Sequence, residues 1–123
     1  MNHAVRWFKR TYESIYTASH LARRFGELEA GSTKYIVKPT TKFRKDYKLL
    51  EKRNLDMSLL DEIIMKLAQG IPLHANNRDH ALIGNYARHR ECRVTPDWLL
   101  IYHIEDDILV LSLTRTGSHS DLF

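Results

Sequence analysis

Reactive side chains gather at both ends of one stretch of the sequence, which runs from Arg93 to His119. Asp97 and Trp98 stand near its start, and Arg115 precedes His119 by one Thr-Gly-Ser step at its end. An arginine can clamp a phosphate, an indole can stack on a nucleobase, and a histidine can exchange a proton near neutral pH. Together these groups could cut RNA without a metal. That reaction needs a base for the ribose 2′-OH, a cation for the crowded phosphorane and an acid for the leaving 5′-oxygen.

Each of these residues also has a plain structural interpretation. An Asp–Arg pair at the end of a sheet is often a surface salt bridge worth about 0–1 kcal/mol. A tryptophan at the edge of a core usually packs, and a histidine near a C-terminus is usually solvated. Their coincidence, rather than any single residue, favours a site.

The residues between the two ends alternate as those of a β-hairpin do. Two strands, 98–104 and 108–115, are rich in Leu, Ile, Val and Tyr, and an acidic turn joins them. A three-residue loop would place Asp97 opposite Arg115, whereas a two-residue loop would place Trp98 there. In both registers a carboxylate, an indole and a guanidinium meet at the open end of the hairpin.

The elements before the hairpin begin with a short strand at 34–38. Thr40 or Thr41 then caps a helix, and after a tight break Asp56 or Ser58 caps a second one. Two helices joined so briefly should pack as an antiparallel pair. Their apolar stripes comprise Phe43, Tyr47 and Leu50 in the first, and Leu60, Ile63, Ile64 and Leu67 in the second.

A long loop at 71–85 leads to a further strand at 86–94. By parity His89, Glu91 and Arg93 should face solvent on this strand. One strand, a helix pair and three antiparallel strands predict an α+β domain with the helices on one face of the sheet.

The N-terminal residues 1–31 are set apart by the linker "EAGSTK" from the domain at 34–123. Their three- and four-residue periodicity predicts an amphipathic helix over about 4–28. This helix could pack on the domain or on a second copy, or could lie on a membrane surface, and the start of the chain could also be misassigned.

Composition excludes several classes of protein. The 123 residues carry a net charge of +4 and contain no apolar run that could span a bilayer, and the N-terminus does not read as a secretory signal. The single cysteine, Cys92, excludes an internal disulfide. No histidine pair has metal-ligand spacing on one helix, so neither a metal nor an organic cofactor is expected. A cytoplasmic protein fits best, with Arg44, Lys48 and Lys52 as a basic helix face or simply a solvated one.

Three segments resemble the YafQ-type toxins of the RelE/ParE superfamily: "RDHALIGNY", "RECRVTPDWLLIYHIEDDILVLSLTRTGSHSDLF" and the helix pair before them. The resemblance covers about Lys34 to Phe123. It implies a small α+β fold like that of microbial RNases and a toxin of a type II toxin–antitoxin pair. Such toxins are ribosome-dependent endoribonucleases that cut mRNA in the A site of the 70S ribosome. A co-expressed antitoxin, similar to DinJ or RelB, silences them.

The resemblance also implies site residues. They are His80 of DHxLxG, Asp97 and Trp98 of PDW, Arg115 and His119 of RTGSH, and the terminal Phe123. His119 would be the general acid and Arg115 the phosphate clamp, with Asp97 or His80 as the base. Trp98 and Phe123 would position the nucleotide, and the basic helix face would contact ribosomal RNA.

Arg93 departs from the pattern, because YafQ-type toxins commonly have a histidine there. An arginine cannot shuttle protons, since its pKa is above about 12. Arg93 could instead stabilise the transition state, or the nuclease could be weakened or inactive. The rival hypothesis is therefore a binding protein: an inactive relative, or a ParE-like toxin that inhibits gyrase.

Overall fold

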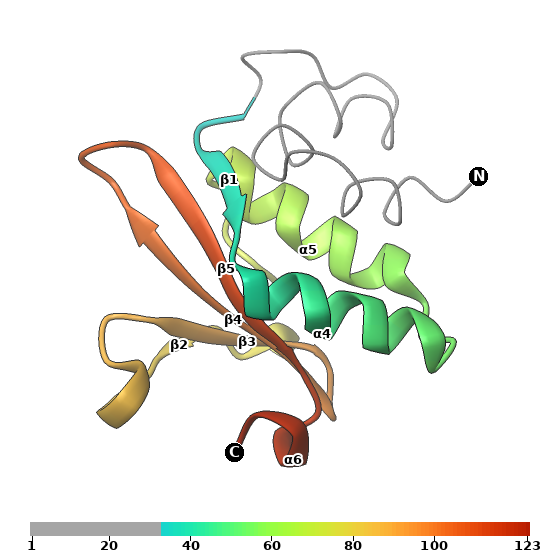
Figure 1. Ribbon diagram of the computed structural model, residues 1–123. Coiled ribbons are helices and arrows are strands. Elements are labelled where there is room, and N and C mark those ends of the chain that lie inside the picture. The colour runs from blue at the N-terminus through green and yellow to red at the C-terminus, as the bar shows by residue number, and fades with distance from the viewer. Residues whose placement is uncertain (1–32) are drawn as a thin grey trace.

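The computed structural model describes residues 33–123, in which one layer of helices covers a five-stranded sheet (Figure 1). The strand order is β1-β5-β4-β3-β2, with β1 parallel to β5 and every other pair antiparallel. The strands are β1 Ile36–Pro39, β2 His80–Ala81, β3 Arg90–Thr95, β4 Trp98–Glu105 and β5 Val110–Gly117. The predicted α+β architecture is confirmed, with β2 as a further edge strand. The helix expected over about 4–28 lies outside the described residues.

The helix pair lies side by side on one face of the sheet (Figure 1), as α4 Thr41–Lys52 and α5 Met57–Gln69. The side chain of Thr40 caps α4, that of Asp56 caps α5, and Gly70 ends α5 in the left-handed region with φ 75°. These local cap signals are why the helix boundaries can be read from the sequence.

The main core fills the space between the helix pair and the sheet. Its largest fully buried side chains are Phe43, Tyr47, Leu50, Leu60, Ile64, Leu100, Tyr102 and Leu111. Each stabilises the fold by about 1.5–3 kcal/mol relative to an exposed position. No helix within residues 33–123 has the length and apolar character to cross a bilayer.

The hairpin of β4 and β5 has neither of the predicted registers. Its loop has four residues, Asp106–Leu109. A bulge beside Ile101 shifts the pairing further, so Arg115 lies opposite Ile101 rather than Asp97 or Trp98.

Two features hold this longer loop, and neither is visible in the alternation of the strands. Leu109 adopts a positive φ of 54° at the end of the loop. The hydroxyl of Tyr35, just before β1, donates a 2.6 Å hydrogen bond to Asp106. A contact over 71 positions in sequence therefore helps to set the register of a local hairpin.

The segment before β3 is more ordered than a loop. It contains two 3-10 turns, η1 Ala75–Asn77 and η2 Gly84–Tyr86, and β2 between them. Because η2 occupies the start of the predicted strand, β3 begins four residues later, at Arg90. The prediction that Glu91 faces solvent is wrong: it is only 8% exposed, and β2 pairs beside it.

Candidate active site

Pairing across the sheet collects predicted site residues on the open face, which is the face away from α4 and α5. His80 on β2 pairs with Glu91 on β3. Glu91 pairs in turn with Ile101, which pairs with Arg115 on β5. Paired residues project to the same side of a sheet. Three strand spacings make this row about 14 Å wide, so His80 and Arg115 border one face without touching each other.

A second row lies two residues further along the strands and contains Arg93, Leu99 and Gly117. Between the charged groups, a small apolar cluster forms the floor of the face: Leu99, Ile101 and Leu122, with Leu82 and Tyr86 packed against them. The half-buried Arg93 makes no side-chain hydrogen bond or ion pair within residues 33–123. The open face thus combines an apolar floor with cationic margins.

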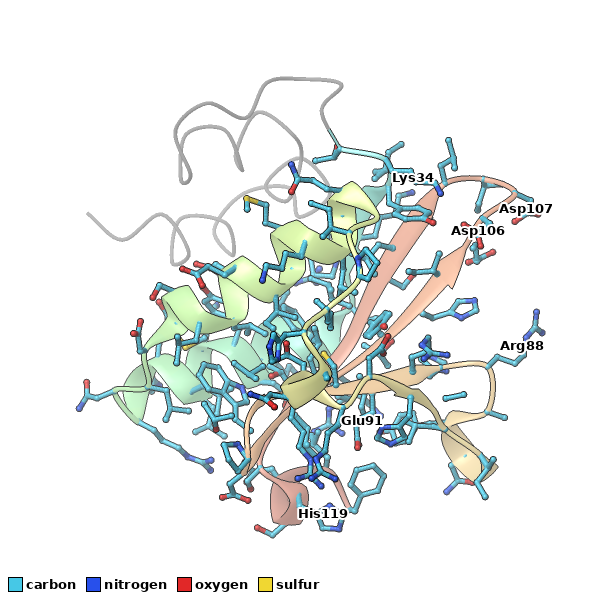
Figure 2. All side chains as sticks on the ribbon, turned by 180° about the vertical axis from the view of Figure 1, so that it is seen from behind. Lys34, Arg88, Glu91, Asp106, Asp107 and His119 are labelled. Carbon is cyan, nitrogen blue, oxygen red and sulfur yellow. The ribbon has the colours of Figure 1, made fainter. Side chains whose placement is uncertain are left out.

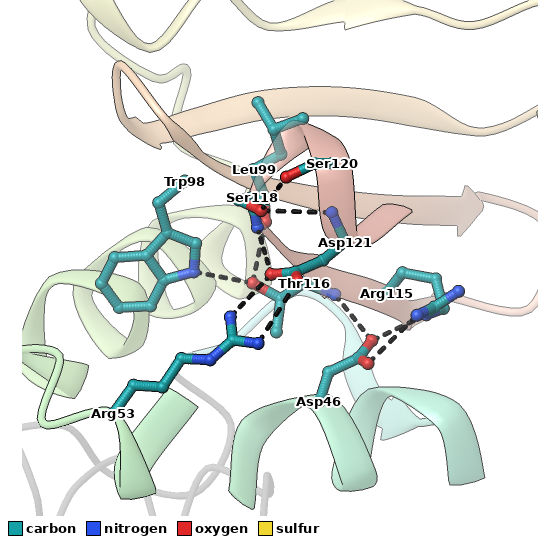
Figure 3. Close-up of polar contacts among 9 residues, drawn as sticks. All are labelled: Asp46, Arg53, Trp98, Leu99, Arg115, Thr116, Ser118, Ser120 and Asp121. Carbon is teal, nitrogen blue, oxygen red and sulfur yellow. Dashed lines mark hydrogen bonds and ion pairs between the residues drawn. The ribbon is translucent and has the colours of Figure 1, made fainter. Parts of the chain in front are cut away.

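Arg115 is held in place by Asp46 of α4 (Figure 3). Its Nε donates to one carboxylate oxygen at 2.7 Å and its Nη2 to the other at 3.2 Å, and the N–H of Thr116 also donates to Asp46, at 3.1 Å. The parallel pairing of β1 with β5 ends at Pro39 and Leu113. Arg115 and Thr116 therefore have no β1 residue beside them, and Asp46 of α4 accepts their hydrogen bonds instead. The hydrogen bond to Asp46 raises the pKa of Arg115 further, so the guanidinium stays cationic.

The residues between Arg115 and His119 build the turn that presents the histidine. The hydroxyl of Thr116 accepts a 2.9 Å hydrogen bond from the Trp98 indole and donates one to the carbonyl of Leu99. A Cβ on Gly117 would lie 3.0 Å from the Asp121 carboxylate, so a larger residue would push this side chain out of its place. Ser118 then caps the short helix α6, His119–Leu122, in a capping box with Asp121.

Asp121 also ties α6 to the end of α4. Arg53 donates to its two carboxylate oxygens at 2.9 and 3.4 Å (Figure 3). This ion pair, helped by the hydrogen bond from the Ser118 backbone, lowers the pKa of Asp121 from 3.8 to about 2. The helix that carries His119 is therefore anchored by charge on one side and by the buried Leu122 on the other.

Aromatic rings extend from His119 along the open face. The exposed imidazole of His119 stacks on Phe123, with ring centroids 5.0 Å apart and planes at 29°. Phe123 meets Tyr86 edge to face at 6.0 Å, and Tyr86 meets His89 at 5.9 Å. His89 in turn lies 5.3 Å from His103. Phe123 is 59% exposed, so its ring remains open to a ligand.

His80 sits at the opposite margin, on β2. Its Nδ1 lies 2.6 Å from the carbonyl oxygen of Arg78, which only accepts, so Nδ1 must be the donor. Its Nε2 lies 3.4 Å from a carboxylate oxygen of Glu91. Glu91 therefore orients the ring of His80, while Asp79 anchors the segment by accepting from Tyr102 at 2.5 Å and Arg90 at 3.2 Å.

Two predicted site residues lie apart from these margins. Asp97 is exposed in the turn between β3 and β4 and makes no hydrogen bond or ion pair with any described residue. Trp98 is only 4% exposed and belongs to the core beneath the helices. Its ring supports the end of β4 through Thr116 and is not available for stacking in this arrangement.

The basic helix face lies on the other layer of the molecule. Arg44, Lys48 and Lys52 recur every four residues on α4, and both lysines are exposed. Arg44 is half-buried and donates to the carbonyl of Pro39 and the hydroxyl of Thr41. This stripe is therefore separate from the open face that carries His80.

The sequence did not point to the residues that hold the site together, which are Asp46, Arg53, Glu91 and Tyr86. They come from α4, its C-terminal cap, β3 and η2, and their spacing from the motifs carries no signal. Within residues 33–123, no three His, Cys, Asp or Glu side chains gather closely enough to share a metal ion.

This fold is that of bacterial toxins from type II toxin–antitoxin systems. The family model for the YafQ toxin of such systems matches residues 35–123, so the chain belongs to the YafQ family. The mRNA interferase toxin YafQ of Escherichia coli K12 is 40% identical over 82 residues, which cover 66% of this chain and 87% of that toxin.

Solved structures agree with this assignment. YafQ from E. coli BL21(DE3) matches with a TM-score of 0.68 at 36% identity, covering 72% of this chain and 98% of that one. The E. coli DinJ–YafQ toxin–antitoxin complex matches with a TM-score of 0.68 at 36% identity, covering 73% and 98%. The resemblance to YafQ-type toxins that the sequence indicates is therefore confirmed.

Proposed function

We propose that this toxin is an endoribonuclease that cuts mRNA in the A site of the translating 70S ribosome, by metal-independent attack of the ribose 2′-OH. The observation that carries the proposal is the open face, where His80, Arg93 and Arg115 lie at the margins and His119 stands at one end. In Figure 2, His119 lies at the end of the molecule away from Asp106 and Asp107 of the hairpin loop. The related E. coli toxin carries the name mRNA interferase, which supports the same activity here.

His119 acts as the general acid for the leaving 5′-oxygen. It is exposed at the start of α6, and its stacking on Phe123 fixes the plane of the ring. Arg115 supplies positive charge to the phosphorane, because Asp46 fixes its guanidinium at the margin of the open face through Nε and Nη2. Arg93 adds a second cation, since it has no acidic partner among the described residues.

The base is Asp97 or His80. Asp97 is free to accept a proton, because it has no hydrogen bond among residues 33–123. In His80, Nδ1 donates to the carbonyl of Arg78 and Nε2 lies 3.4 Å from a carboxylate oxygen of Glu91, so the ring is held at the margin of the open face. One of the two accepts the 2′-OH proton, and the other orients the nucleophile.

Phe123 and Tyr86 contact a nucleobase. They lie in the ring row beside His119, and stacking on aromatic side chains is worth roughly 1–3 kcal/mol per base. Trp98 contributes only through the strand end that it supports. Lys48 and Lys52, with Arg44, contact ribosomal RNA from α4.

A cognate antitoxin of the DinJ or RelB kind neutralises the toxin, which acts in the cytoplasm where the ribosomes are. The E. coli relative is solved in complex with its antitoxin DinJ, which supports such a partner. Co-purification with the product of the neighbouring gene would identify this antitoxin.

Primer extension on translating ribosomes tests the proposal. The wild-type protein should give cuts in A-site codons, and His119→Ala should slow them by about 10²–10⁴-fold, the usual contribution of a general acid. Ser120→Ala, on the same turn of α6, is the matched control and should cut as the wild type does. Both variants should still bind the antitoxin. Full cutting by His119→Ala would remove this residue from the mechanism.

Arg93 favours a second candidate, a toxin that binds without cutting or that inhibits gyrase as ParE-like toxins do. An arginine cannot replace the proton transfer of the histidine common at this position. Inhibition of gyrase supercoiling without any A-site cuts would favour this candidate. A large gain of cutting in Arg93→His would mark Arg93 as an inactivating difference.

A further inference from the structure

A groove lies beside the turn between β3 and β4, next to the row of Arg93. It runs between η1 and the end of β3, and its polar lining comprises Asn76, Asn77, Arg78, Arg93 and Thr95. The side-chain amide of Asn77 donates a 2.7 Å hydrogen bond to the carbonyl oxygen of Arg93. This bond joins η1 to β3, and the two arginines border the groove between them.

Neither arginine has an acidic partner within residues 33–123. Arg78 is exposed, with φ 48°, and its carboxylate neighbour Asp79 is engaged by Arg90 and Tyr102. Asp97 follows the groove in sequence but makes no ion pair with Arg78 or Arg93. Two cations without a counter-charge at one groove repel each other and attract an anion.

We propose that this groove binds a phosphate of single-stranded RNA next to the phosphate that is cut, with Arg78 as a binding residue. This inference rests on the proposed function and extends it beyond the predicted site residues. Arg93 belongs both to the open face and to the groove, so one strand of RNA can pass from the face into the groove. The planar guanidinium fork suits a phosphate, and the side chains of Asn76 and Thr95 offer polar atoms to the ribose.

An acidic segment of a protein partner, such as the antitoxin, could also bind to Arg78 and Arg93. Continuity with the face that carries His80 and Arg115 favours RNA. The test therefore measures both ligands.

The experiment measures binding of the full chain to a short fluorescent RNA whose riboses are 2′-O-methylated, so that no 2′-OH attack can occur. Arg78→Ala should weaken binding roughly tenfold, as expected when a hydrogen bond to a charged group is lost. It should also reduce the slope of log affinity against log salt by about 0.7, the value for one contact to a single-strand phosphate.

Arg88→Ala is the matched control. Arg88 is also exposed, has a positive φ of 74°, makes no side-chain ion pair among the described residues, and projects from the body of the protein in Figure 2. This variant should bind RNA as the wild type does. An equal loss in both variants would mean general charge attraction and would overturn the inference. So would unchanged RNA binding in Arg78→Ala, no salt-dependent RNA binding by the wild type, or a loss of antitoxin binding alone.

The proposed function fails in a different way. If the wild type gives no A-site cuts but binds RNA through Arg78, the nuclease activity is absent and the phosphate groove remains. If the wild type cuts and Arg78→Ala cuts and binds equally well, the groove is not used and the nuclease remains.

Discussion

Arg115 donates from two guanidinium nitrogens to Asp46, a residue 69 positions earlier in the chain. The motif RTGSH predicted that Arg115 belongs to a site, because arginine and histidine types at that spacing suit phosphate chemistry. It could not predict Asp46, since nothing in the spacing of α4 residues marks a partner on β5. The same holds for Glu91 beside His80: alternation predicts which side a residue faces, but not what will cover it.

Asp46→Asn should lower the rate of mRNA cutting strongly, while it lowers the free energy of unfolding only slightly. An asparagine keeps one acceptor for Arg115 or Thr116 but loses the charge that holds the guanidinium with two hydrogen bonds. Loss of such a bond costs about 1–2 kcal/mol of unfolding free energy. Denaturant unfolding and primer extension measure the two effects.

Asp56→Ala is the stability control for this variant. It removes the cap of α5, which costs about 1 kcal/mol, without touching Arg115. Equal cutting by the two variants would mean that Asp46 serves stability alone.

At the scale of elements, the sequence predicts the ends of the two helices well, because the residues that cap them, Thr40, Asp56 and Gly70, lie next to the helices in sequence. The hairpin register was predicted wrongly, because it depends on a bulge and on Tyr35, far away in the sequence. The short helix α6 depends both on a local residue and on a distant one. Its cap, Ser118, is local, whereas its anchor to Arg53 spans 68 positions.

The docking of α6 should weaken in acid between about pH 4 and pH 2. The pKa of Asp121 is about 2, below its usual 3.8, so its carboxylate stabilises the docked helix above pH 4. This contribution is lost as pH falls through the pKa of the folded state. Amide NMR shifts of residues 118–123 against pH would follow the change.

Arg53→Gln should move this acid transition upward, toward pH 3.8, because Arg53 is the largest cause of the low pKa. A wild-type transition already near pH 4, unchanged in Arg53→Gln, would contradict the assigned role of the ion pair.

At the scale of the whole molecule, the single cysteine reports whether a reagent can reach the core of the folded protein. Cys92 is fully buried in the main core, and burial raises the pKa of its thiol well above the usual value. The thiol should therefore resist a thiol reagent at pH 8 until the protein opens. Its labelling rate should follow the unfolded fraction, measured by circular dichroism, as denaturant increases. Rapid labelling of fully native protein would show that the core opens locally around β3.

Two ion pairs join α4 and its cap to β5 and α6. They determine when the folded toxin can first form during synthesis. Asp46 and Arg53 are synthesised early, whereas their partners Arg115 and Asp121 follow 69 and 68 positions later. A nascent chain on the ribosome can form both helices but cannot yet hold Arg115 or dock His119. Since domains fold as units once their contacts are available, the arrangement of the site arises only after residues 115–121 have emerged from the ribosome. If the toxin cuts mRNA as proposed, a nascent chain therefore cannot cut the mRNA from which its residues 33–114 are being translated.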